Sequence, residues 1–233
     1  MEVCEYRAPP YVKLSSRKYR NPNVRLNPYS AVPKKYHANM LMSRIGKRFI
    51  VAQSPMTADA LHDDTTIDFI EMIIAEGVES VIMVGSLNTC SMYYSSTVGQ
   101  LKLSRYTILT ESVEFFMGCA DVIERSIRIV DRKTKLERTI RHYQIQGWEH
   151  GNIPRAEVRI INGLLSDITS TNWFAGKRYD GFESARQIGF LQMMVVYRMT
   201  RLYGLEDHMF RQLHAMFNEM IEQQVGVPRG KVF

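Results

Sequence analysis

The sequence predicts an α/β fold, a twisted mixed β-sheet flanked by α-helices, and three observations support it. Residues 48–55, 63–77 and 78–85 follow one another with the signals of a strand, a helix and a strand. The segments 125–131 and 136–148 alternate in side-chain character around a polar link, which predicts a hairpin of long strands. The C-terminal half carries helical signals instead.

The first three elements have clear local boundaries. RFIVAQSP (48–55) is typical of a short strand, which Pro55 stops. In 63–77, Asp and Thr residues stand where a helix would start, apolar residues recur at helical spacing, and Gly77 closes it. VESVIMVG (78–85) is then expected to be a buried strand.

Helical patterns follow toward the C-terminus. PRAEVRIINGLLSDI (154–168) begins with Pro154, which suits the first turn of a helix. Two more helical stretches, 188–203 and 206–224, are separated at Gly204. No repeat and no low-complexity segment interrupts this order.

Length and composition bound the domain organisation. The 233 residues are 45% hydrophobic, enough for one sizeable core. Residues 1–35 are rich in Pro, Asn, Tyr and Arg without a sustained period, so we expect a surface arm there and a single domain over 36–233. Without a signal peptide or an apolar run long enough to cross a bilayer, we expect a soluble, cytoplasmic protein with no transmembrane segment.

Charge and cysteine content limit the partners. The net charge of +6 would suit an anionic partner, either an acidic peptide or a membrane-surface lipid. Neither a basic face interleaved with aromatic residues nor a nucleic-acid motif occurs, so we expect no nucleic-acid partner. Three scattered cysteines without zinc-ligand spacing predict reduced thiols, no metal and no cofactor.

Six segments of the chain match one known pattern in the right order. They are YHAN (36–39), FIVAQSPM (49–56), TTIDFIEMI (65–73), VESVIMV (78–84), CSMYY (90–94) and RTIRHYQIQGWEHGNIP (138–154). Together they resemble the classical protein-tyrosine phosphatase domain, whose acid loop the last segment contains. The resemblance implies the protein-tyrosine-phosphatase-like fold. The chain stops at Phe233, near where the family's glutamine loop would start, so the resemblance also implies a truncated C-terminus.

YDGFESARQIGF (179–190) stands where the family's signature His-Cys-Ser-Ala-Gly-x-Gly-Arg-Thr-Gly-x-Phe belongs. Without gaps, Asp180 takes the place of the nucleophilic cysteine and Arg186 that of the signature arginine. An Asp is a poor nucleophile toward a phosphate monoester, and its charge about 4 Å from a phosphate charge would cost roughly 4 kcal/mol at an effective dielectric of 20. Asp180 and Arg186 therefore form either a structural ion pair or a surface for a phosphorylated or acidic tyrosine-containing segment.

The acid loop is altered as well. In WEHGNIP, counting from Trp148 gives His150 the position of the general acid, whereas matching the His-Gly pair gives it to Glu149. Either side chain can donate a proton. Because no thiolate is left for a general acid to assist, we expect the residue at this position to be a solvated charge on the loop. Trp148 is expected to be a hinge or packing residue.

Two further short motifs need an interpretation. SRKYRN (16–21) resembles the family's phosphotyrosine-recognition loop, with Tyr19 as the stacking residue and Tyr11 as a rival. CADVIER (119–125) also has the Cx5R spacing of the signature, but it lacks glycines and precedes a strand. We expect Cys119 to be a small buried residue and not a nucleophile.

Three functions remain open. The first is a catalytically inactive, pseudophosphatase domain that binds or scaffolds a tyrosine-containing protein partner in signalling. The second is a residual phosphatase that hydrolyses phosphotyrosine with an unusual nucleophile. The third is a truncated copy that folds poorly. Because the fold segments are kept while the chemical positions are changed, the first is our working hypothesis.

Overall fold

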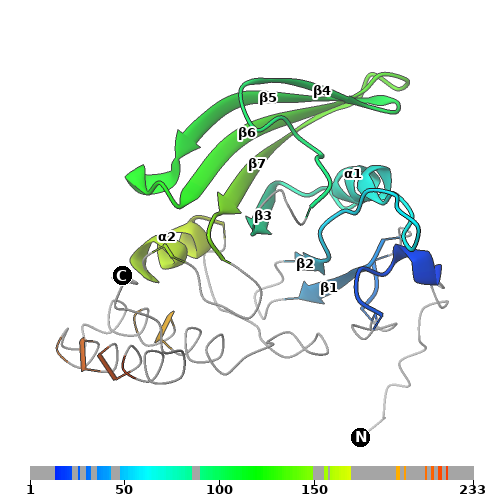
Figure 1. The fold of residues 1–233 in the computed structure, drawn as a ribbon. Helices are drawn as coiled ribbons and strands as arrows, with labels where there is room; N and C mark the ends of the chain where they lie inside the picture. Colours follow the sequence, from blue (N-terminus) through cyan, green and yellow to red (C-terminus); the bar gives the residue numbers. More distant parts are fainter. Residues whose placement is uncertain are drawn as a thin grey trace, which may run out of the picture.

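The computed structural model describes residues 14–22, 26, 30–32, 36–42, 48–85, 90–148, 155–156 and 158–168, followed by the positions 193–194, 197, 208, 211–212, 215–216 and 219. Its centre is a five-stranded mixed sheet in the order β3-β7-β6-β5-β4 (Figure 1). These strands are β3 (Ser80–Val84), β4 (Gly99–Leu103), β5 (Tyr106–Phe115), β6 (Val122–Asp131) and β7 (Glu137–Ile145). The predicted mixed α/β sheet is therefore confirmed.

The hairpin predicted from alternation is β6 and β7. The two strands pair antiparallel from Val122 opposite Ile145 to Val130 opposite Glu137. From Arg125 to Asp131 the burial on β6 alternates, because every second side chain points into the core. The parallel pair in the sheet is β3 with β7, in the register Ser80 opposite Arg141.

Helix α1 (Thr66–Ala75) lies within the predicted range 63–77. The backbone N–H of Thr66 donates to Asp64 Oδ1 at 2.7 Å, which satisfies one of the free donors at the helix start. Helix α2 (Val158–Ile168) lies within the predicted 154–168. The isolated positions between 193 and 219 are helical too, in the range where two further helices are expected.

The two helices cover opposite faces of the sheet. Helix α1 contributes Ile70 and Ile73 to a core that also contains Ile140 of β7. Helix α2 contributes Ile160 and others to a second core with Tyr143 and Ile145 of β7. Since neighbouring side chains of a strand point to opposite faces, β7 joins the two cores from its two sides.

Two features differ from the sequence-based expectation. Strand β2 (Arg48–Ala52) does not join β3 in one sheet: it pairs antiparallel with β1 (Ala38–Met42) in a separate two-stranded sheet, which lies below the large sheet in Figure 1. Strands β4 and β5 were not predicted. Their connecting turn contains Ser104 at φ 50° and no glycine, so the usual hairpin signal is missing.

Candidate functional site

The first part of the site is the segment 14–22, which contains Tyr19. A short 3-10 helix, η1 (Ser16–Lys18), begins at Ser15, whose hydroxyl oxygen accepts a hydrogen bond from the Arg17 backbone N–H at 3.3 Å. The Lys18 ammonium pairs with Asp68 in the first turn of α1. The segment is thus anchored to α1, the helix that contributes Ile70 and Ile73 to one of the two cores.

Gln53 fixes the backbone on both sides of Tyr19. Its side-chain oxygen accepts from the backbone N–H of Arg20 at 3.1 Å, and its side-chain nitrogen donates to the carbonyl of Lys18 at 2.8 Å. Gln53 is itself buried. The Tyr19 ring is half-buried and meets His37 edge-on, with 4.8 Å between the ring centroids. The Gln53 amide and the His37 ring therefore fix the position of Tyr19.

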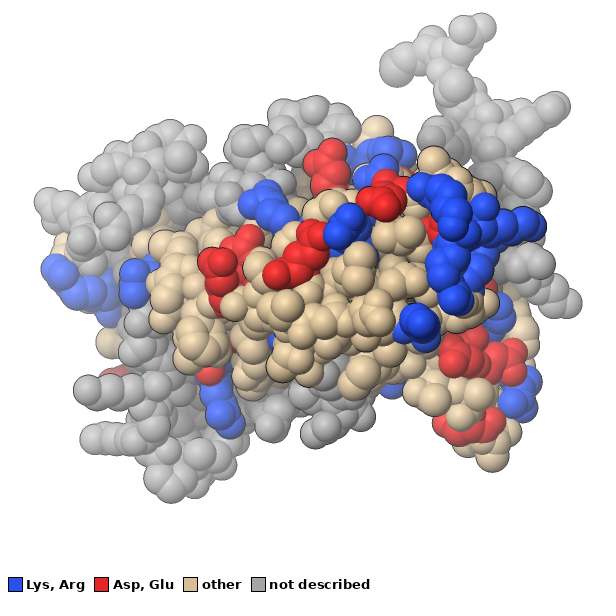
Figure 2. Space-filling view, turned by 90° about the horizontal axis from the view of Figure 1, so that it is seen from above, with Lys and Arg blue, Asp and Glu red and all other residues tan. Residues whose placement is uncertain are grey.

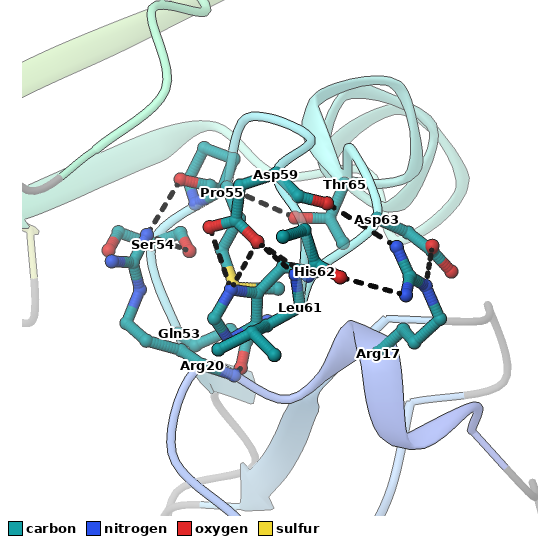
Figure 3. A network of polar contacts seen from close by, with 12 residues as sticks. Arg17, Arg20, Gln53, Ser54, Pro55, Asp59, Leu61, His62, Asp63 and Thr65 are labelled. Atoms are coloured by element: carbon teal, nitrogen blue, oxygen red, sulfur yellow. Dashed lines mark hydrogen bonds and ion pairs between the residues drawn. The ribbon is translucent and has the colours of Figure 1, made fainter.

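Two arginines tie the same segment to the loop 53–65 (Figure 3). Arg20 donates to the carbonyl of Pro55 at 3.0 Å. Arg17 donates to Asp63 Oδ1 at 2.7 Å and to the carbonyl of Ala60 at 3.2 Å. Both guanidinium groups use backbone carbonyls of the loop, so the two pieces of chain form one surface.

The loop 53–65 is closed by its own hydrogen bonds. Met56 and Thr65 bond across its base: the Met56 N–H donates to Thr65 Oγ1 at 2.9 Å and the Thr65 N–H donates to the Met56 carbonyl at 3.0 Å. At the tip, His62 lies 2.9 Å from Asp59 Oδ2. This hydrogen bond and the backbone N–H groups of Leu61 and His62 lower the pKa of Asp59 to about 2. The loop therefore presents a fixed negative charge.

The second part of the site is the end of β7, where Trp148 lies. Gly147 has φ +66°, and a Cβ placed there would be 2.8 Å from the Arg155 side chain, so a larger residue would be strained and would displace Arg155. Trp148 is partly buried and packs against the core of α2, which includes Ala156 and Ile160. This contact agrees with a packing role, one of the two roles expected for Trp148, which stays a prediction.

The remaining predicted site residues lie outside the described residues. They are Asp180, Arg186, Glu149, His150 and Tyr11. Their roles stay predictions. Among the residues that the structure describes, no group of three or more His, Cys, Asp or Glu side chains could hold a metal ion.

The second Cx5R motif is part of the framework. Cys119 precedes β6, as expected, but it is half-buried and not fully buried as the sequence predicts. Arg125 is buried on β6, where it donates to Gln144 Oε1 at 3.2 Å and its guanidinium lies 5.0 Å from the centre of the Tyr94 ring. A buried arginine that bonds to an amide and a ring fixes neighbouring strands, so this motif builds the core.

His142 belongs to the same buried group. Its Nε2 lies 2.7 Å from the Tyr93 hydroxyl. Burial, and then the nearby charge of Arg125, lowers the pKa of His142 to about 3. The imidazole is neutral at physiological pH and forms part of the core.

The order of segments described in the sequence is that of a known protein family. The family model described as protein-tyrosine phosphatase matches residues 16–174. No curated protein sequence matches the chain. Within the described residues, no helix is long and apolar enough to cross a membrane.

Solved structures show the same fold. PTPN18 in complex with one HER2 phosphopeptide is 16% identical with a TM-score of 0.58, covering 81% of this chain and 68% of that one. PTPN18 with a second HER2 phosphopeptide is 15% identical with a TM-score of 0.56, covering 88% of both chains. At this identity the likeness concerns the fold alone.

Proposed function

Because the chain belongs to the protein-tyrosine phosphatase family, we propose that it is a catalytically inactive member that binds a tyrosine-containing protein in cytoplasmic signalling. The observation that carries the proposal is the sequence YDGFESARQIGF (179–190), in which the resemblance puts Asp180 at the cysteine position of the family signature. The six fold segments that precede it, within residues 36–154, are kept. A chain that keeps the framework and loses the nucleophile is suited to binding without turnover.

The chemistry of position 180 excludes the family's usual first step. That step needs a thiolate, which attacks phosphorus and forms a covalent intermediate. A carboxylate is a weaker nucleophile, and it repels the phosphate dianion. The loop that follows, GFESA, contains Phe182 and Glu183 where the family has small residues whose backbone N–H groups approach the phosphate. In our proposal, Asp180 occupies the anion position and pairs with Arg186.

The Tyr19 segment supports retained recognition. An aromatic ring that stacks on a ligand tyrosine works best when its backbone is already ordered, because little entropy is then lost on binding. Gln53 provides this order with two hydrogen bonds around Tyr19. The HER2 phosphopeptides in the PTPN18 complexes make a phosphotyrosine segment a reasonable first ligand to test.

The test is a titration of matched phosphotyrosyl and unphosphorylated peptides against the purified chain. We expect binding without phosphate release. Asp180→Ala should tighten the phosphopeptide selectively, because it removes the competing carboxylate. Tyr19→Ala and Gln53→Ala should weaken both peptides, while Leu61→Ala, an exposed change in the neighbouring loop, should have no effect.

Other outcomes separate the alternatives. Phosphate release that Arg186→Ala abolishes would contradict inactivity and identify a residual phosphatase. A broad thermal transition together with no binding would favour a poorly folding copy. Binding that none of the Asp180, Tyr19 and Gln53 variants affects would place the partner surface elsewhere.

A further inference from the structure

Two neighbouring turns at one end of the sheet gather positive charge. The β4–β5 turn region, 102–106, contains Lys102 and Arg105, and the β6–β7 turn region, 131–136, contains Arg132, Lys133 and Lys135. The carboxylate within these two stretches is Asp131. Figure 2 shows Lys and Arg side chains gathered at one end of the molecule. We call this pair of stretches the basic turns.

Hydrogen bonds join the basic turns into one unit. The backbone N–H of Arg132 donates to the Arg105 carbonyl at 2.9 Å, and its guanidinium donates to the carbonyls of Arg105 and Ser104. Asp131 Oδ1 accepts from the Lys133 N–H at 2.9 Å. The cations of two separate hairpins are therefore held side by side before any ligand arrives.

Most of this charge is not neutralised locally. Arg105 lies 3.4 Å from Asp131 and 3.8 Å from Glu71. Lys102, Lys133 and Lys135 are exposed, and within the described part of the chain no carboxylate lies within ion-pair distance of them. The basic turns thus present an excess of lysine charge to solvent.

An apolar side chain stands next to these lysines. Leu136 follows Lys135 and is 66% exposed. The φ of Lys135 is +61°, so the chain turns sharply just before Leu136. A single exposed leucine is common, but one beside several unpaired cations matches the chemistry of a bilayer interface, where lipid phosphates lie directly above acyl chains.

We propose that the basic turns form a docking surface for an anionic lipid bilayer. Hairpin ends project from the sheet, so a flat surface can reach both turns together (Figure 1). Lysines suit diffuse lipid charge, since they act as point charges without a fixed hydrogen-bonding geometry. An acidic peptide would be the other anionic partner, and the experiment distinguishes the two.

The experiment measures co-sedimentation of the full chain with vesicles of phosphatidylcholine alone or with 30% phosphatidylserine (roughly the anionic content that gives a strong surface potential). We expect binding to the anionic vesicles only. Lys133→Gln with Lys135→Gln should weaken it about thirtyfold, since each lysine near such a surface contributes about a factor of five. Leu136→Ser should weaken it by a smaller factor.

The matched control is Arg159→Gln with Arg211→Gln. Both arginines are exposed, and the double change also removes two positive charges, but outside the basic turns. The thermal midpoint of the Lys133→Gln, Lys135→Gln variant should equal that of the wild type. An equal loss of vesicle binding in both double variants would mean that only the net charge of the protein matters, and would overturn the proposal. Binding to a polyglutamate peptide with the same sensitivity, without vesicle binding, would also overturn it and assign the turns to an acidic protein.

Discussion

Two buried glutamines do similar chemistry in different surroundings. Gln53 holds the exposed segment around Tyr19 through the backbone of Lys18 and Arg20. Gln144 accepts from Arg125 and from Tyr94 inside the core and donates to the Gly85 carbonyl at 3.3 Å. The Gln53 bonds are partly buried and hold an exposed segment, so water competes with them more than with the fully buried bonds of Gln144. The segment around Tyr19 can therefore change with less effect on the fold than the buried group around Gln144.

The largest effect should follow from breaking the core side of this comparison. Tyr94→Ala removes a fully buried ring, together with its hydrogen bond to Gln144 and its contact with the Arg125 guanidinium, so we expect a loss of about 3–5 kcal/mol in the free energy of unfolding. Urea denaturation measures it. Gln53→Ala should cost only about 1–2 kcal/mol. Equal losses in the two variants would contradict the difference between core and surface.

A smaller effect should appear with pH. The folded pKa of His142, about 3, lies below its unfolded value near 6.5, so the unfolded chain binds more protons below pH 6.5. The stability from this group is complete above pH 6.5 and is lost as the pH falls toward 3, by about 2 kcal/mol at pH 5. Thermal or urea unfolding between pH 7 and 5 tests this.

His142→Gln supplies the control, because a glutamine does not titrate. The variant should be less stable at pH 7 but should show a flatter pH dependence. Asp59 does not disturb this window, since its lowered pKa of about 2 confines its change to more acidic solution. The same slope in both proteins would mean that another group causes the acid sensitivity.

The smallest effect belongs to the exposed ion pair. Arg17 and Asp63 are 49% and 40% exposed at their side chains, so water screens their attraction. A double-mutant cycle with Arg17→Ala and Asp63→Ala should give a coupling below about 1 kcal/mol. A coupling free energy above about 2 kcal/mol would show that this surface is as rigid as the core. It would contradict the difference between the exposed segment and the buried group around Gln144.

The fold was more predictable than the site. Side-chain alternation located β6 and β7, and cap and periodicity signals located α1, because these signals are local. The family resemblance is confirmed by the matching model over 16–174. Strands β4 and β5 were missed, since Ser104 and Arg105 form a turn that usually needs Gly or Asn.

The anchors of the site leave no local signature. Gln53 binds a backbone N–H that lies 33 residues earlier in the chain, so no spacing rule points to it. Tyr19 was found through the resemblance alone. The placement of Asp180 at the cysteine position follows from the resemblance and lies beyond the matched range 16–174, so this placement and its consequence for catalysis stay a proposal.

The parallel pairing of β3 with β7 has a consequence for how the protein folds. Ser80 and Arg141, which lie opposite each other, are separated by roughly sixty residues, and closing such a loop costs entropy before any contact is gained. The β6–β7 hairpin needs only a short turn. The hairpin can therefore form early and act as the template on which β3 is added, so the two sides of β7 are completed on different timescales.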